Sequence, residues 1–164
     1  MSHLKYDSYA GAGQWLNEHL GYSQAVRVGD RIEISGQGEC YHRLPFPQGT
    51  QQGSPLTGGW EVKDNAPSFP SDLKAEIDKA FENVDTTLKS IGGKGWSQVY
   101  RVNSYHTNLE QTEEVTGAMS AGFAKWMPDH KPIWTEIGVK RLGAPDMRVE
   151  IEVVAHDPEG AKSA

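Results

Sequence analysis

The middle of the chain carries the pattern that most constrains its fold. Apolar residues recur there at helical spacing, at Leu73, Ile77, Ala80, Phe81, Val84, Leu88 and Ile91. Ser71 is a suitable N-cap, Asp72 lies at the positive end of the helix dipole, and Gly92-Gly93 is expected to end the helix. A helix with one apolar face has to bury that face against a second layer. The flanking segments must therefore supply a sheet or further helices.

Strand patterns on both sides of this helix indicate a sheet. Apolar residues alternate on either side of Gly29-Asp30, at Val26, Val28, Ile32 and Ile34, which predicts a β-hairpin with a tight turn. Further strands are predicted over 98–107, 133–140 and 147–155. The resulting order, ββαβαββ, predicts an α+β fold in which both helices cover one face of a mixed sheet.

A second helix is predicted between the third and fourth of these strands. Its apolar face is formed by Val115, Met119, Phe123 and Trp126, and Pro128 ends it. Gly117 and Gly122 lower its intrinsic stability, so tertiary packing must support it.

The length of the chain fits one domain. It has 164 residues, of which 37% are hydrophobic, and we expect a single domain over residues 1–164. Residues 1–20 form a polar N-terminal extension, 38–70 a long loop rich in Pro and Gly, and 157–164 a flexible tail in this interpretation. No apolar run reaches the roughly 18 residues that a bilayer span needs, and the first residues lack a signal-peptide pattern. We therefore expect a soluble, cytoplasmic protein, with a mitochondrial location not excluded.

Several kinds of site are disfavoured by the sequence. Cys40 is the only cysteine, so no internal disulfide is possible, and Cys40 and His42 do not match a metal-ligand spacing. The glycines of 92–95 follow a helix instead of opening one, which is the wrong context for phosphate binding. A net charge of −6 makes nucleic acid an unfavourable partner. We expect no metal and no cofactor.

Four segments together resemble the Rid family, the reactive intermediate deaminases also called YjgF. They are Gly21 to Val26 (GYSQAV), Ile34 to Gln37 (ISGQ), Ala80 to Val84 (AFENV) and Val149 to Ala155 (VEIEVVA), and they occur in the order found in that family. The resemblance covers residues 21–157. It implies a chorismate-mutase-like fold, a homotrimer with small-molecule clefts between subunits, and hydrolysis of enamines or imines to ketones and ammonia.

The resemblance also assigns residues to the cleft. A family tyrosine corresponds to Tyr22, a family glycine to Gly36 and a family glutamate to Glu150. The family asparagine of the second helix corresponds to Thr116, which retains a hydroxyl. The family arginine corresponds to Trp134, and an indole cannot hold a substrate carboxylate as a guanidinium does. The change argues against a standard 2-imino-acid substrate.

Each of these residues has a structural interpretation beside the functional one. Tyr22 can fill the edge of the hairpin, and Gly36 can mark a bend in its strand. Thr116 can pack on its helix, and Trp134 can pack at a subunit interface. These alternatives are left open by the sequence.

The last two strands are predicted to form a hairpin whose turn is centred on Gly143 and Ala144. That register places Glu136 opposite Glu150. Two carboxylates at one patch favour opposite protonation states, which suits acid and base catalysis. We therefore expect Glu150 to handle the attacking water and Glu136 to be its partner; the alternative is that both glutamates are simply solvated on an exposed strand.

Three functions follow from these observations. The first is a Rid-like hydrolase or deaminase acting on a small imine or enamine. The second is a binding protein that retains the cleft but has lost the reaction. The third, an endoribonuclease, is disfavoured by the net charge and by the lack of a run of basic residues.

Overall fold

A computed structural model describes residues 2–38, 61–63, 66–68, 72–107, 110, 112–143 and 146–163. Within these ranges it contains the following helices and strands: β1 (Lys5–Asp7), α1 (Ala12–Leu20), β2 (Ala25–Val28), β3 (Arg31–Gly38), β4 (Glu61–Lys63), β5 (Ala66–Ser68), α2 (Leu73–Ser90), the 3₁₀ helix η1 (Gly95–Gln98), β6 (Val99–His106), α3 (Thr112–Trp126), β7 (Ile133–Gly138), β8 (Val149–His156) and α4 (Pro158–Ala161). The predicted α+β class, with a mixed sheet, is confirmed.

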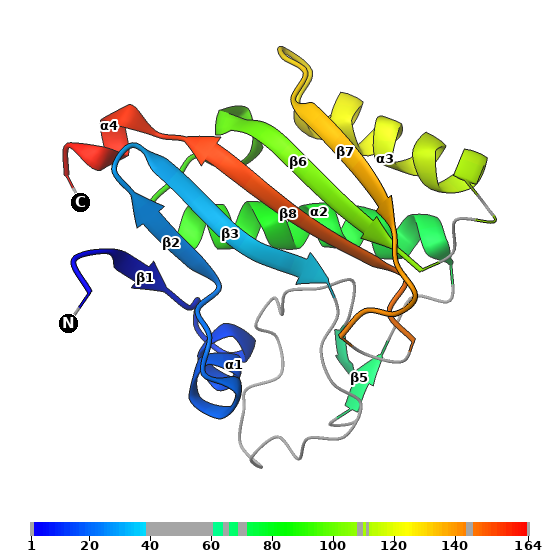
Figure 1. Ribbon diagram of the computed structural model, residues 1–164, viewed down its shortest axis with the longest axis horizontal. Coiled ribbons are helices and arrows are strands. Elements are labelled where there is room, and N and C mark those ends of the chain that lie inside the picture. The colour runs from blue at the N-terminus through cyan, green and yellow to red at the C-terminus, as the bar shows by residue number, and fades with distance from the viewer. Residues whose placement is uncertain are drawn as a thin grey trace.

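One six-stranded sheet organises the molecule, in the order β1-β2-β3-β8-β6-β7. Its neighbouring strands are antiparallel except β6 and β7, which are parallel. In Figure 1 the helices α2 and α3 both lie behind the sheet, and its opposite face is turned toward the viewer. We call this face, which lies opposite the described helices α2 and α3, the uncovered face. The prediction that two helices cover one face of a mixed sheet is confirmed.

The predicted first hairpin is confirmed with its register. Val28 pairs with Arg31, so that Gly29 and Asp30 form the turn, and Gly29 has the positive φ of 61° that such a turn requires. Alternation along β3 places Ile32 and Ile34 toward the helices, where both are buried.

The predicted hairpin between the last two strands is wrong, because β6 lies between β7 and β8. Glu136 of β7 lies opposite Ser104, and Glu150 of β8 lies opposite Tyr105. Neighbouring residues of a strand point to opposite faces, so Glu136 faces the helices and Glu150 faces away from them. The physical reason is the crossover through α3: a strand that returns over a helix runs parallel to the strand before it. The turn residue Ala144 lies outside the described residues.

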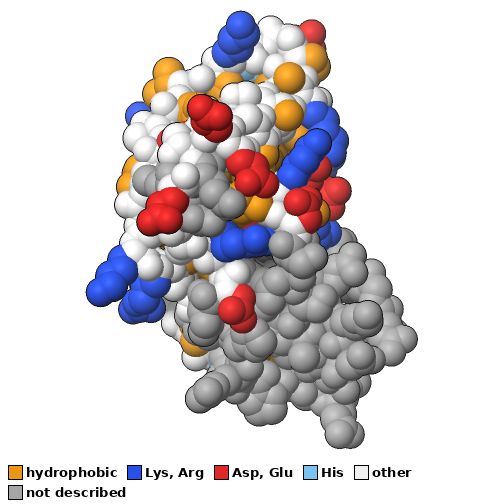
Figure 2. Space-filling model, turned by 90° about the vertical axis from the view of Figure 1, so that its right-hand side faces the viewer, with side chains coloured by type: hydrophobic (Ala, Val, Ile, Leu, Met, Phe, Trp, Pro, Cys, Tyr) orange, Lys and Arg blue, Asp and Glu red, His pale blue; other side chains and the backbone are white. Residues whose placement is uncertain are grey.

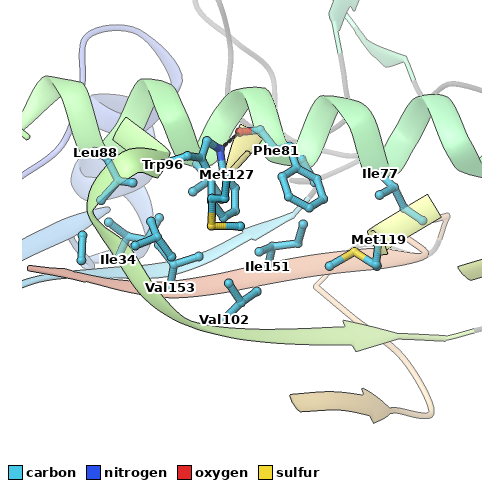
Figure 3. Close-up of a cluster of buried hydrophobic side chains, with 14 of the residues drawn as sticks. Ile34, Ile77, Phe81, Leu88, Trp96, Val102, Met119, Met127, Ile151 and Val153 are labelled. Atoms are coloured by element: carbon cyan, nitrogen blue, oxygen red, sulfur yellow. Dashed lines mark hydrogen bonds between the residues drawn. The ribbon is translucent and has the colours of Figure 1, made fainter. Parts of the chain in front are cut away.

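The core lies between α2, α3 and the sheet (Figure 3). Phe81 and Trp96 are in ring contact, and the Trp96 indole N–H donates to the Phe81 carbonyl at 2.9 Å, so this large side chain is buried with its polar atom satisfied. Val115 and Met119 of α3 are buried, and Phe123 and Trp126 pack against the cluster, as the sequence predicts. Packing thus supports a helix whose glycines weaken it.

The ends of α2 follow the prediction to within one residue. Its N-cap is Asp72, whose carboxylate accepts from the Ala75 backbone N–H at 2.9 Å, and not Ser71, which lies outside the described residues. Gly92, with a φ of 88°, follows the helix, and the N–H of Gly93 donates to the Leu88 carbonyl at 2.9 Å.

The N-terminal residues contain structure that the sequence did not predict. β1 pairs antiparallel with β2 and becomes one edge of the sheet, and α1 lies at the end of the sheet where β2 begins (Figure 1). Tyr9, Trp15 and Leu16 are buried. The polar residues around these few apolar ones hide the helical pattern.

The long predicted loop is only partly described. It contains the short antiparallel pair β4 and β5. The rest of 39–70, including Cys40 and His42, lies outside the described residues.

The start of the C-terminal tail is fixed and not frayed. Asp157 is 1% exposed; its carboxylate forms an ion pair with Arg27 at 2.7 Å and accepts from the Gln98 amide at 2.7 Å. The same side chain caps α4 through the Gly160 N–H. No helix in the described parts of the chain is long and apolar enough to cross a membrane.

Candidate functional site

The site predicted from the sequence is divided between the two faces of the sheet. Gly36 and Glu150 come together at the uncovered face. Thr116, Trp134 and Glu136 come together on the helix side, near the β7 edge. The chain therefore carries two separate clusters.

A β-bulge in β3 shapes the first cluster. Ile34 pairs with Val153 and Gln37 with Ile151, so β3 has one residue more than β8 over this stretch. The extra residue lets both Ile34 and Gln37 face the helices, with Ser35 and Gly36 between them. Gly36 lies directly beside the Glu150 side chain, because a Cβ built on it would overlap that carboxylate. The close approach of the Glu150 side chain to the β3 backbone thus explains why residue 36 is a glycine.

Glu150 is partly buried beside a second carboxylate. Burial raises the pKa of Glu150, and the nearby negative charge of Glu152 raises it further. The hydroxyl of Tyr105 donates to the Glu152 carboxylate at 2.8 Å. That hydrogen bond, together with burial, raises the pKa of the Tyr105 phenol.

Tyr22 lies just before β2, near the bulge. Two residues further on, the carbonyl of Gln24 accepts from the Ser35 backbone N–H at 3.0 Å, which joins the start of this strand to the bulge. The Tyr22 side chain is 37% exposed, and its carbonyl accepts from the Asn17 amide at 3.0 Å. The tyrosine is accessible from solvent and lies two residues before Gln24, which bonds to the bulge segment.

Trp134 belongs to the second cluster and packs there. Its indole N–H donates to the Ser104 hydroxyl at 2.9 Å, and its ring meets Phe123 edge to face, with 5.0 Å between centroids. The indole is partly buried against the core. These contacts support the structural interpretation of Trp134, although the partner is α3 of the same chain and not another subunit.

Thr116 and Glu136 complete the second cluster. The Thr116 hydroxyl donates to the Glu136 carboxylate at 3.0 Å, and the other oxygen of that carboxylate lies 3.9 Å from Nε2 of His106. His106 is fully buried, and burial lowers its pKa to about 4, so the imidazole is neutral at pH 7. Glu136 therefore has a hydroxyl and a neutral imidazole as neighbours.

Two residues of this region were missed by sequence reasoning. His106 was one of several scattered histidines, and only the strand alternation, which places it on the buried face of β6, could have marked it. Gln37 closes the SGQ motif and is 1% exposed; its amide oxygen accepts from Thr87 of α2 at 3.1 Å, and its amide nitrogen donates to Gln24 at 3.3 Å. Gln37 thus ties the bulge to α2, so this residue of the motif is structural.

Groups of three or more His, Cys, Asp or Glu that could hold a metal ion are absent from the described part of the chain. Glu150, with its raised pKa and its position at the surface, is the group best suited to exchange a proton with a ligand.

Comparison with known proteins agrees with this fold and these motifs. The model of the family described as Endoribonuclease L-PSP matches residues 14–157. The chain belongs to this family. It is the family also known as YjgF or Rid, so the resemblance carried by the four segments is confirmed.

Solved structures of YjgF-family proteins match almost the whole chain. The protein YJGH is 26% identical, with a TM-score of 0.65, and the match covers 96% of this chain and 99% of that one. Rv2704 from Mycobacterium tuberculosis is 21% identical, with a TM-score of 0.63, over 93% of this chain and 98% of that one. TdcF from E. coli, solved with bound serine, is 18% identical, with a TM-score of 0.59, over 92% of each chain. A search of curated protein sequences returned no match.

Two positions bear on whether a cation lies near Glu150. Trp134, to which the resemblance assigns the family arginine, lies on the helix side of β7, beside Ser104 and α3. Arg101 is on the uncovered face but four residues along β6 from Tyr105, about 13 Å at the usual rise of a strand. Neither position supplies a cation directly beside Glu150.

Proposed function

We propose that this YjgF-family protein is a hydrolase that converts a small imine or enamine into a carbonyl compound and ammonia. The observation that carries the proposal is the Glu150 carboxyl group, which burial and Glu152 make more basic and which lies against Gly36 at the uncovered face. A carboxylate with a raised pKa is a better general base and works closer to neutral pH.

The reaction needs one water and one group that moves protons. Glu150 takes a proton from the water as its oxygen adds to the C=N carbon, and an enamine first becomes an imine by protonation at carbon. Glu150 then returns the proton to the nitrogen, which gives a carbinolamine. Glu150 next carries the proton of the new hydroxyl group to the amino nitrogen, the C–N bond breaks, ammonia leaves and the C=O bond forms, so no oxidant or cofactor is consumed.

We propose that the complete site lies between subunits of a homotrimer. Tyr22, Gly36 and Glu150 of one subunit would face Thr116, Trp134 and Glu136 of its neighbour, because one subunit carries these clusters on opposite faces of its sheet. In this arrangement Glu136 can act as the second acid or base only across the subunit boundary. The Trp134 indole offers an apolar wall, which suits a substrate without a carboxylate at that position.

The mixed charge on one side of the described surface favours a small-molecule ligand over a nucleic acid. Figure 2 shows the side of the molecule that is at the right in Figure 1, where acidic, basic and hydrophobic side chains are interspersed. A single-strand binder would need a continuous basic groove with stacking aromatics. TdcF, with its bound serine, is a family example of a small ligand.

Ammonia release from imines generated in the assay tests the proposal. We expect wild-type protein to accelerate release from an imine without a carboxylate, and Glu150→Gln to lose at least about 100-fold of that acceleration, the range of general base catalysis. Glu82→Gln removes an exposed carboxylate of α2 and is the matched control. If the protein accelerates ammonia release from no imine, the proposal that it is an enzyme is wrong and the ligand-binding function is favoured. If it accelerates release only from imines that bear a carboxylate, the proposed substrate class is wrong.

A further inference from the structure

On the uncovered face, the side chains of Tyr105, Glu150 and Glu152 form a polar group that the reaction above does not fully use. Tyr105 lies directly opposite Glu150, and Asn103, two residues before it on β6, lies opposite Glu152. Residues two apart on a strand share a face, so Tyr105, Glu150 and Glu152 lie side by side. Tyr105, on β6, is thus a cross-strand neighbour of both carboxylates of β8.

The contact between Tyr105 and Glu152 is diagonal. Its phenol hydroxyl reaches Glu152 Oε2 at 2.8 Å instead of the glutamate directly opposite. A hydroxyl that donates to a carboxylate limits the rotamers of that side chain. The Glu152 carboxylate is therefore held at a position beside Glu150.

Glu150 itself is fixed from the other side. Its side chain lies against the backbone of Gly36, in a space that no Cβ occupies. With Gly36 on one flank and the Tyr105 and Glu152 pair on the other, Glu150 cannot move away from the second charge without leaving its place over the bulge.

We propose that Tyr105 is a positioning residue: by holding Glu152 in place, it keeps a second negative charge beside Glu150 within the same subunit. Glu152 thereby supplies, within one subunit, the neighbouring carboxylate that the sequence expected from Glu136, which lies on the other face. The catalytic role of this arrangement rests on the proposed function, but the titration that tests the arrangement does not. Like charges held together make Glu150 a stronger base, which is what an attack by water requires.

Titration of the glutamate carboxyl groups by ¹³C NMR tests the proposal without any substrate. Glu152→Gln removes the charge at constant shape, and we expect the pKa of Glu150 to fall by about 0.5–1 unit, as for two charges about 6 Å apart near a surface. Tyr105→Phe keeps the ring but removes the donor, so it should lower the pKa of Glu150 in the same direction by a smaller amount. Tyr100→Phe, on the same strand, is the control and should leave it unchanged.

Two results would overturn the inference. If Tyr105→Phe leaves the pKa of Glu150 unchanged while Glu152→Gln lowers it, Tyr105 only fills space. If neither variant changes it, Glu152 does not act on Glu150 at all.

Activity measurements separate this inference from the proposed function. If imines are hydrolysed, the acidic limb of the pH profile of kcat/KM should move to lower pH in Tyr105→Phe by the shift that NMR measures. If wild-type protein hydrolyses no imine but the NMR shifts occur, the reaction is wrong and the positioning role stands. If hydrolysis occurs and the shifts do not, the positioning role is wrong and the reaction stands.

Discussion

Gly36 shows how one residue links the fold to the proposed chemistry. An added Cβ would overlap the Glu150 carboxylate, so the side chain could keep its place only if the backbone moved. We expect Gly36→Ala to reduce any Glu150-dependent activity at least about 10-fold and to destabilise the protein by about 1–3 kcal/mol, as overpacking does. Activity and urea unfolding measure the two effects.

A double variant, Gly36→Ala with Glu150→Ala, tests whether the overlap with Glu150 causes the loss of stability. Glu150→Ala removes the side chain that Gly36→Ala displaces, so the stability losses of the two substitutions should be less than additive. Full additivity would mean that the glycine is required by the backbone bend alone.

His106 makes stability depend on pH. Its pKa is lowered to about 4 in the folded protein by burial, whereas an unfolded histidine titrates near 6.5. As pH falls below 6.5 the unfolded chain takes up a proton that the folded protein refuses, so stability should fall by up to about 3 kcal/mol between pH 6.5 and 4.

Urea unfolding of wild-type protein and His106→Gln at pH 7 and pH 4.5 measures this contribution. Other groups titrate in both proteins, so the difference between them isolates His106. An equal loss of stability in the two proteins would contradict the prediction.

At this scale, sequence reasoning found residues that carry a motif and missed those defined by their surroundings. Gly36 and Glu150 were identified separately, and the structure brings them into contact. The roles of Tyr105 and His106 depend on which residues lie across the strands, Glu152 and Glu136 among them, and such cross-strand neighbours are not visible in local spacing.

Among the elements, α3 contains a natural comparison of two glycines. A Cβ at Gly122 would overlap the Phe81 ring, whereas one at Gly117 meets no atom within 4 Å. We expect Gly122→Ala to destabilise the protein by about 1–3 kcal/mol and Gly117→Ala to stabilise it by about 0.5–1 kcal/mol. Chemical unfolding of both variants measures whether the two changes in the free energy of unfolding have opposite signs. A loss of stability in both variants would mean that helix propensity does not determine the effect at the exposed Gly117.

Helices and strands were predicted well where their periodicity is long. α2, α3, the first hairpin and the later strands lie close to their predicted bounds. The pairing of β7 with β6, and not with β8, could not be predicted from local spacing, because it is set by the crossover through α3. The short elements β1, α1 and α4 were missed because tertiary contacts, such as that of Asp157 with Arg27, stabilise them.

For the whole molecule, the uncovered face of the sheet predicts assembly. Ile133, at the β7 edge, is 61% exposed on this face, opposite Arg101. We expect sedimentation to give a mass three times the 18.1 kDa of the chain. Ile133→Asp should shift the protein toward monomer, because a carboxylate in an apolar interface costs several-fold or more in affinity.

Leu20→Asp is the control for this experiment. Leu20 is also an exposed apolar residue, 38% accessible, but it ends α1, away from the face of the sheet. A monomeric wild-type protein, or an equal effect of both substitutions, would exclude the proposed assembly through this face.

The position of β8 has a consequence for synthesis of the protein. β8 is the last strand of the described chain, yet it joins β3 to β6 and so connects the two halves of the sheet. Until β8 has left the ribosome, the N-terminal ribbon β1-β2-β3 and the pair β6-β7 have no hydrogen-bonded link among the described strands. A nascent chain therefore cannot close this sheet before Val149–His156 has emerged, and a premature stop codon ahead of Val149 would leave two open strand edges exposed to aggregation.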